Sequence, residues 1–298
     1  MTLLAPDAGE RMQMAAVKGR SLWDDAGRRL MRNKAAVAGM IVLGVLVLLA
    51  VVGPYLVPFA YDLVDKQDVW LPPLKGGHLL GSDALGRDLT ARLLTGLRVS
   101  LAIGLVATTV SLVIGVAWGA VAGYVGGKLD EVMMRAVDVL YSLPFIFFVI
   151  LLMVTFGSNI ILIFVAIGAV EWLTMSRIVR GQTLTLKNKE FVEAARAAGL
   201  SRSAIIARHI VPNLLGPVVV YVTLTIPAVI LAESFLSFLG LGVQPPMASL
   251  GTLIAGGASD MELAPWLLIF PSLVMVVTLM CFNFIGDGLR DAIDPKDR

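Results

Sequence analysis

The sequence predicts an all-α integral membrane protein with six transmembrane helices and both termini in the cytoplasm. Of its 298 residues, 57% are hydrophobic and only 15% are charged, and the mean hydropathy is +0.85. Water-soluble domains of this length do not have such a composition. Several uncharged runs reach the length of about 20 residues that a helix needs to cross roughly 30 Å of hydrocarbon. The uneven distribution of Lys and Arg then sets the orientation.

The predicted spans are uncharged runs separated by polar segments or by Gly and Pro. Residues 139–170 are too long for one span, and Gly157, Ser158 and Asn159 interrupt them, so a helical hairpin is predicted there. Residues 234–259 are also uncharged, but their Gly-Leu-Gly and Pro-Pro steps favour a re-entrant or surface-lying segment over a seventh span. The other four spans are 35–57, 99–125, 210–232 and 263–286.

Positive charge divides the chain into two sides. Of the 24 Lys and Arg residues, 19 fall on one side of the six-span arrangement and five on the other. The richer side is assigned to the cytoplasm. The expected organisation is a cytoplasmic N-terminal arm (1–34), a six-helix membrane domain (35–288) with extracytoplasmic loops (58–98 and 236–263) and a cytoplasmic loop (177–208), and a cytoplasmic tail (289–298).

The cytoplasmic loop 177–208 is large enough to engage a partner and carries a net charge of +5. Alanines recur at helical spacing up to Gly199, which favours a left-handed helix stop. Ser201 can then cap a second short helix, and Pro212 is expected to bound that helix before the next span. Its small residues suit docking into a groove, whereas an inert basic loop is the alternative. A DNA-binding helix-turn-helix is a disfavoured alternative, because membrane helices tether both ends of the loop and it cannot approach a duplex freely.

A resemblance to the EAA loop of bacterial ABC importer permeases covers EFVEAARAAGLSRSAIIARHIVPN at residues 190–213. The matching positions are Glu193, Ala194, Ala195, Gly199 and Pro212. His209 and Val211 depart from the general signature, but RHIVPN is similar to the peptide branch of the family. Three further stretches resemble the C-type permease subunit of oligopeptide importers. They are GSDALGRDLTARLLTGLRVSL from residue 81, AESFLSFLGLGVQPP from residue 232 and PWLLIFPSLVMVVTLMCFNFIGDGLRDAIDPKDR from residue 265. Leu250 stands where the family usually has Trp.

The resemblance implies a permease subunit in a bacterial inner membrane that moves oligopeptides or dipeptides by alternating access. Its partners would be a homologous second permease subunit, two cytoplasmic ATPase subunits, an extracytoplasmic substrate-binding protein, the peptide and membrane lipid. ATP and Mg would bind to the ATPase subunits. The residues implied in coupling to those subunits are Glu193, Ala194, Ala195, Gly199, Leu200 and Pro212.

Two other transport functions are alternatives. The same architecture also serves for importing nickel chelates or other small solutes. An ion-coupled secondary transporter is a different class, and it would need a coupling-ion site and usually an inverted repeat. Neither feature is visible in the sequence.

Residues 82–98 have the pattern of an amphipathic helix lying on the outer face of the membrane. Leucines recur every four residues from Leu85, and Asp88 precedes Arg92 by one helical turn. Such a helix would dock the external binding protein or cover the translocation path, or it would serve as an interfacial anchor. Its charged positions are Asp83, Arg87, Asp88 and Arg92.

Glu171 and Glu233 are the carboxylates that lie deepest in the predicted spans. An ionisable group at that depth is costly, which makes each a functional candidate. Glu233, with Ser234 and Ser237, is a candidate for the translocation path or a gate, and a structural role is the alternative for both acids.

The sequence favours no catalytic, metal or nucleic-acid function. GYVGGKL at residues 123–129 lacks the first glycine and the final Ser or Thr of a phosphate-binding loop, and no hydrolytic motif is present. His78, His209 and the single Cys281 are isolated, which predicts no metal site. The net charge of +2 is too small to suggest a nucleic acid. We therefore expect no catalytic residue and no cofactor in this chain.

Overall fold

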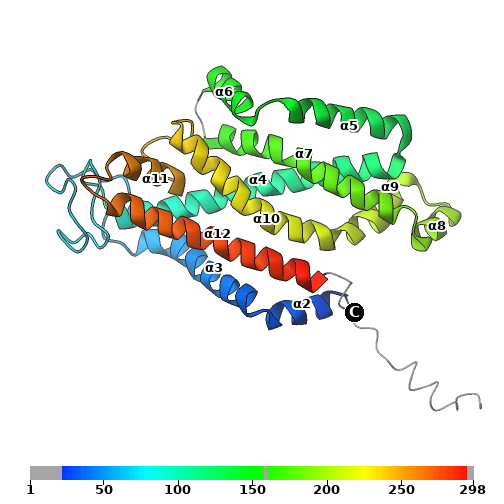
Figure 1. Cartoon of the computed structure of the whole chain (residues 1–298), viewed down its shortest axis with the longest axis horizontal. Coiled ribbons are helices and arrows are strands. Elements are labelled where there is room, and N and C mark those ends of the chain that lie inside the picture. The colour runs from blue at the N-terminus through cyan, green and yellow to red at the C-terminus, as the bar shows by residue number, and fades with distance from the viewer. Residues whose placement is uncertain (1–21, 158–159, 294–298) are drawn as a thin grey trace, which may run out of the picture.

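The computed structural model describes residues 22–157 and 160–293, and these ranges are built from helices without a β-strand (Figure 1). Residues 1–21 of the predicted arm, residues 294–298 of the predicted tail, and Ser158 and Asn159 of the predicted hairpin turn lie outside the described residues. The helices are α2 (Leu22–Arg32), α3 (Lys34–Val52), η1 (Gly53–Tyr55), α4 (Leu89–Val125), α5 (Gly127–Ser142), α6 (Phe145–Phe156), α7 (Ile160–Leu186), α8 (Glu190–Ala197), α9 (Arg202–Ile205), η2 (Ile206–Ile210), α10 (Val211–Phe238), α11 (Leu250–Ser259) and α12 (Trp266–Ile293).

Among the residues that the structure describes, four helical segments are long and apolar enough to cross a membrane, which fits the predicted all-α integral membrane fold. They are Lys34–Tyr55, Leu89–Val125, Arg202–Phe238 and Trp266–Ile293. Each overlaps one of the four single spans that the sequence predicts. The second arm of the predicted hairpin forms α7, which has 27 residues.

The first arm of the predicted hairpin 139–170 is not a straight span. The axes of α5 and α6 differ by 83°. Pro144 accounts for the bend, because its ring disfavours helical backbone at the preceding residue, and Leu143 has an extended ψ of 129°. Counting this bent pair as one span gives up to five spans by length and composition, so the predicted number of six is not confirmed.

The outer helix predicted for residues 82–98 is wrong in its start and in its orientation. Residues 82–88 form a loop, and α4 begins at Leu89, where the Asp88 carboxylate accepts the Ala91 N–H at 2.7 Å. The helix then continues into the membrane span without a break. Leu89 and Leu97 are only 1% and 2% exposed. The leucines of the stripe that lie in α4 therefore pack against the protein, whereas Leu85 in the loop is 48% exposed. The predicted outer loop 58–98 is a loop only as far as residue 88.

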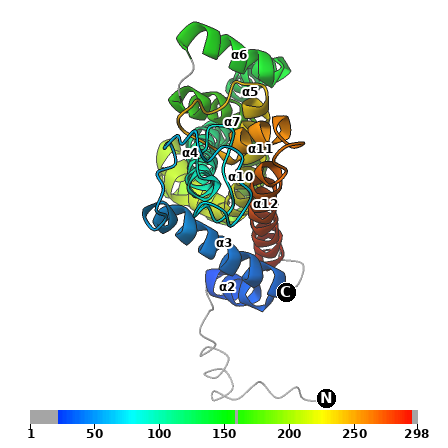
Figure 2. The same ribbon diagram turned by 90° about the vertical axis from the view of Figure 1, so that its left-hand side faces the viewer.

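The bundle is centred on α4, α7 and α10, with α12 and α3 packed on one side and α5 and α6 on the other (Figures 1 and 2). α4 and α7 approach closely through glycine. A Cβ atom at Gly119 would overlap the Ser176 carbonyl oxygen, and one at Gly123 would lie 2.9 Å from the Arg180 carbonyl oxygen. Small residues of this kind allow two membrane helices to pack backbone to backbone.

The two ends of the bundle are built differently (Figure 1). Toward one end lie α2, the C-terminal part of α12 and the α8–α9 segment. The other end is formed by the loop between α3 and α4 together with α11. This short helix packs on α10 and α12, and its 10 residues make the segment 234–259 a short excursion rather than a seventh span, as predicted.

Candidate functional site

In the α8–α9 segment a short helix ends at a turn around Gly199 and a second helix begins after it, as the sequence predicts. Gly199 follows α8 with a φ of 79°, which favours glycine. The N–H of Leu200 donates to the carbonyl of Ala195 at 3.2 Å and closes the end of α8. Ser201 then caps α9 by accepting the Ala204 N–H at 3.3 Å. The backbone therefore fixes the angle between the two helices.

The inner face of α8 holds the segment against the bundle. Val192 and Ala195 are 0% and 6% exposed and lie in one apolar cluster with Tyr124 of α4. Arg196 adds a polar contact, because its Nε donates to the Tyr124 hydroxyl at 3.3 Å and its guanidinium lies 5.2 Å from the ring centroid. Ala195 thus packs inward instead of sharing an exposed face with Ala194, as the spacing suggested.

The outer face of α8 is free to contact a partner. We define it by the exposed residues on the side away from Val192 and Ala195, which are Glu190, Phe191, Glu193, Ala194, Ala197 and Ala198. Within the described residues the Glu193 side chain has no hydrogen bond or ion pair. The face therefore presents two carboxylates and one aromatic ring among small side chains.

Pro212 does not end the second short helix, which corrects the predicted boundary. α9, η2 and α10 form one continuous helical segment of 37 residues from Arg202 to Phe238. Pro212 has no N–H, and the helix widens to a π turn directly before it, where Val211 donates to Ile206 five residues back. At 1.5 Å per residue, this rod is about 55 Å long. It connects the α8–α9 segment to the opposite end of the bundle.

Glu233 lies near the far end of that rod in a buried polar cluster, which we define as Glu233, Ser237, Ser249 and Ser100. Glu233 is 0% exposed, and its Oε1 accepts hydrogen bonds from Ser237 at 2.6 Å and from Ser249 at 2.7 Å. Ser249 also caps α11, and Ser100 of α4 accepts the N–H of Leu250, the first residue of α11, at 3.0 Å. The buried polar cluster therefore ties α10, α11 and α4 together.

The three predicted gate residues do not act as one group. Glu233 and Ser237 are joined, whereas Ser234 donates to the Ile230 carbonyl at 2.8 Å and contacts the Met275 sulfur at 3.4 Å. Oε2 of Glu233 is buried and has no hydrogen-bond partner among the described residues. Ser237 lies four residues from Glu233 and was predicted, whereas Ser249 lies 16 positions from Glu233 and Ser100 lies 150 positions from its partner Leu250, so sequence spacing did not reveal these two.

The four predicted outer-face residues also separate into two groups. Asp83 pairs with Arg87 at 2.8 Å and with Arg92 at 3.4 Å. Asp88 instead accepts from buried His78 at 2.8 Å while capping α4. His78 is not isolated as the sequence suggested: it is 2% exposed and packs within a loop that also contributes Asp68, at 3.2 Å.

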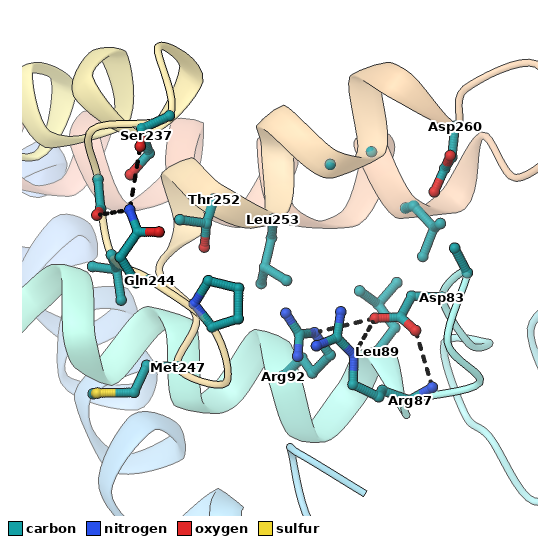
Figure 3. Close-up of a pocket in the computed structure, with 18 residues that line it drawn as sticks. Asp83, Arg87, Leu89, Arg92, Ser237, Gln244, Met247, Thr252, Leu253 and Asp260 are labelled. Atoms are coloured by element: carbon teal, nitrogen blue, oxygen red, sulfur yellow. Dashed lines mark hydrogen bonds and ion pairs between the residues drawn. The ribbon is translucent and has the colours of Figure 1, made fainter. Parts of the chain in front are cut away.

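A cavity of about 310 Å³ opens at this end of the bundle between α4, α10 and α11 (Figure 3). Asp83, Arg87 and Arg92 lie together on one wall, and Asp260 lies on another, at the end of α11. Ser237 of the buried polar cluster also lines the cavity. Within the described residues no group of three or more His, Cys, Asp and Glu side chains has the arrangement of a metal site.

Two ion pairs attach α5 to α7, and sequence reasoning missed both. Arg180 binds Asp130 through two nitrogen atoms at 2.6 and 2.7 Å. Arg177 binds Asp138 at 2.8 Å and lies 4.2 Å from the centroid of the Tyr141 ring. The partners are 50 and 39 residues apart, which no local pattern reports.

Two families of known proteins match the chain. Residues 115–298 match the family described as "Binding-protein-dependent transport system inner membrane component", and residues 21–73 match "N-terminal TM domain of oligopeptide transport permease C".

Similar proteins extend the match over nearly the whole length. The oligopeptide transport system permease protein OppC of Escherichia coli strain K12 is 58% identical over 95% of this chain and 94% of its own. The protein of the same name from Haemophilus influenzae is 55% identical over 97% and 93%. The dipeptide transport system permease protein DppC of Bacillus subtilis is 45% identical over 93% and 87%.

A solved structure is similar in fold. It is described as an inward-facing conformation of the MetNI methionine ABC transporter, and it matches with a TM-score of 0.56 at 20% identity, over 68% of this chain and 96% of that one. At this identity the likeness concerns the fold alone.

Proposed function

The chain belongs to the binding-protein-dependent transport system inner membrane component family, and from this membership we propose that it is the C-type permease subunit of an ATP-driven importer of oligopeptides. It is a multi-pass protein of the inner membrane. The observation that carries the proposal is the 58% identity to an oligopeptide permease over 95% of this chain. A relative named for dipeptides is less similar, at 45%.

Permeases of this family work with partner permease, ATPase and substrate-binding subunits. For this chain we propose a homologous second permease, two cytoplasmic ATPases that bind ATP and Mg, and an extracytoplasmic binding protein. The outer face of α8 is the surface that docks an ATPase. Its exposed Glu193 and small alanines suit insertion into a groove, and Gly199, Leu200 and Ser201 hold the second helix at a fixed angle.

The continuous helical rod supplies a mechanical route for alternating access. A displacement of α9 by an ATPase moves a rod of 37 residues without a hinge of loop residues. Near its far end the buried polar cluster joins α10 to α11 and α4, which line the cavity. Closure of the ATPase pair would in this way change the opposite end of the bundle. The peptide path lies between the two permease subunits, so this chain supplies half of it.

The orientation follows from the charge count. The end that carries α2 and the α8–α9 segment belongs to the side with 19 of the 24 Lys and Arg residues, and we assign it to the cytoplasm. Reporter fusions after Arg298 and in the loop at Val243 should then report opposite sides. Equal signals from both fusions would reject this orientation.

Uptake by the assembled transporter tests the substrate class. The chain is co-expressed with its partner permease, ATPase and binding-protein subunits, and right-side-out or inverted membrane vesicles are supplied with radiolabelled tri-alanine. We expect right-side-out uptake that requires internal ATP and persists when an ionophore collapses ion gradients. Uptake driven by a gradient without ATP would support a secondary transporter instead. ATP-dependent uptake of a nickel chelate but not of tri-alanine would move the assignment to the small-solute branch.

A further inference from the structure

One wall of the cavity at the loop end of the bundle carries more positive than negative charges. Arg87 Nε lies 2.8 Å and Arg92 Nε lies 3.4 Å from the same oxygen, Oδ2 of Asp83. Two guanidinium groups therefore share one carboxylate, which leaves one positive charge in excess on this wall. A partly buried charge without a full partner is costly, so this wall favours a second anion.

The two arginines are placed to hold such an anion. Arg92 is 7% exposed, its Nε makes no hydrogen bond among the described residues, and one terminal nitrogen donates to the Tyr61 carbonyl at 3.3 Å. The guanidinium groups of Arg87 and Arg92 lie next to each other beside Asp83 (Figure 3). The fork of N–H groups on a guanidinium matches the two oxygens of a carboxylate.

The opposite wall offers a complementary group. Asp260 closes α11, lines the same cavity, and has no side-chain hydrogen bond or ion pair within the described residues. The surface between the two charged walls is partly apolar, with Leu89, Leu253 and Leu267. A volume of about 310 Å³ is at the small end of ligand pockets, which run from about 300 to 1,000 Å³. A cavity of this volume suits a small ligand such as a di- or tripeptide, which is about 7–11 Å long when extended at about 3.5 Å per residue.

We propose that this cavity is a subsite for the charged ends of a short peptide, with its terminal carboxylate at Arg87 and Arg92 and its terminal ammonium group at Asp260. The inference rests on the proposed function and adds a recognition site within the permease itself. The site lies at the end of the bundle opposite the outer face of α8. Ser237 is part of the rod that begins at α9, lines the cavity and donates to Glu233. A peptide bound in the cavity would therefore contact this rod directly.

The test measures binding to the full complex of both permeases and both ATPases in lipid nanodiscs, without the binding protein. The probe is radiolabelled tri-alanine, compared with its C-terminal amide and its N-acetyl form. We expect the amide to bind about tenfold more weakly, because it loses a charge-assisted contact. Arg87→Gln should weaken tri-alanine by a similar factor and leave the amide unchanged. Asp260→Asn should weaken tri-alanine but not the N-acetyl form.

Lys75→Gln is the matched control, because Lys75 is an exposed base of the same outer loop that does not line the cavity. It should leave all three ligands unaffected. Assembly of each variant complex is checked by its retained ATPase subunits, which separates lost binding from misfolding.

Several results would overturn the inference. These are equal affinity for tri-alanine and its amide, equal effects of Arg87→Gln and Lys75→Gln, or no measurable binding by the wild-type complex. If Arg87→Gln weakens attachment of the binding protein while tri-alanine binding is unchanged, the arginines serve protein docking instead. ATP-dependent peptide uptake by the wild-type transporter, measured in parallel, reports on the proposed function separately: persistent uptake with no binding to the cavity rejects the subsite alone.

Discussion

Replacing Gly199 with valine should uncouple transport from ATP hydrolysis while leaving the membrane bundle intact. Gly199 has a φ of 79°, a conformation that glycine adopts freely. A Cβ atom built there meets no atom within 4 Å. The effect of a substitution is therefore a backbone effect and not a steric clash with the bundle.

The size of that effect can be worked from the turn itself. A left-handed conformation costs an L-residue about 1–2 kcal/mol, and a β-branched residue more. The turn is closed by the hydrogen bonds of Gly199 to Arg196 at 2.9 Å and of Leu200 to Ala195 at 3.2 Å, each contributing about 0.5–1.5 kcal/mol. The penalty is comparable to one of these bonds. Because about 1.4 kcal/mol changes an equilibrium tenfold, the population with α9 correctly placed should fall by about tenfold or more.

Two substitutions make the interpretation specific. Gly199→Asn should retain most activity, because asparagine tolerates the left-handed region. Gly181→Ala tests a glycine on α7 that also has no atom within 4 Å of a built Cβ but has no positive φ, and it should be neutral or slightly stabilising. The assay combines membrane abundance, co-purified ATPase and uptake of radiolabelled tri-alanine. Equal uptake by Gly199→Val and Gly199→Asn would refute the reasoning, because it would show that the left-handed turn is not needed.

Substitutions at three further contacts, each with a comparison variant, provide additional tests. Glu193→Lys should reduce co-purification of the ATPases, whereas Glu262→Lys, on an exposed acid at the opposite end, should not; normal ATPase retention in Glu193→Lys would exclude a direct contact. Glu233→Ala should lower the amount of folded protein in the membrane more than Glu233→Gln, because alanine removes the acceptor of two buried hydroxyl groups, at about 1–3 kcal/mol each; equal abundance of the two variants would mean that the cluster does not stabilise the fold. Asp130→Asn should lower the melting temperature slightly. Arg180 is 35% exposed, so its ion pair with Asp130 contributes on the order of 1 kcal/mol. The charge exchange Asp130→Arg with Arg180→Asp should recover part of the loss. No recovery would count against a direct pairing.

Local patterns in the sequence were sufficient where the structure is local. Gly199 and Ser201 each act within four residues, through a left-handed backbone and a helix cap, and both were predicted correctly. The four long apolar runs were also recognisable, because crossing a membrane depends on length and composition alone. The prediction that the alanines of α8 share one face was only partly correct, because Ala194 is exposed and Ala195 is buried. Spacing assigns residues to a face, but the position of Tyr124 decides that Ala195 faces inward.

The errors came from segments in which two local signals compete. Ser82, Asp83 and Asp88 are all good helix caps, and the predicted outer helix starts at Ser82 or Asp83, whereas α4 is capped by Asp88. Gly86 argued against the earlier start, since it has a φ of 72° and a Cβ there would overlap the Asp65 carbonyl oxygen. In residues 139–170 the absence of charged residues indicated two straight arms of a hairpin, so the bend at Pro144 was not predicted. The pairing of Arg180 with Asp130 joins distant helices and leaves no periodic trace in the sequence.

The buried polar cluster around Glu233 has a mechanical role, because it attaches the far end of the rod to α11. A rod can transmit a displacement only if its far end is fixed to the elements that must move. An apolar contact between α10 and α11 would allow them to slide, because dispersion contacts have little directional preference. The hydrogen bonds of Ser237 and Ser249 to one carboxylate oxygen are directional, and the Ser249 hydroxyl also caps the N-terminus of α11. A displacement of α9 is therefore expected to carry α11 and the Asp260 wall with it, and Glu233→Ala should reduce uptake per folded transporter as well as abundance.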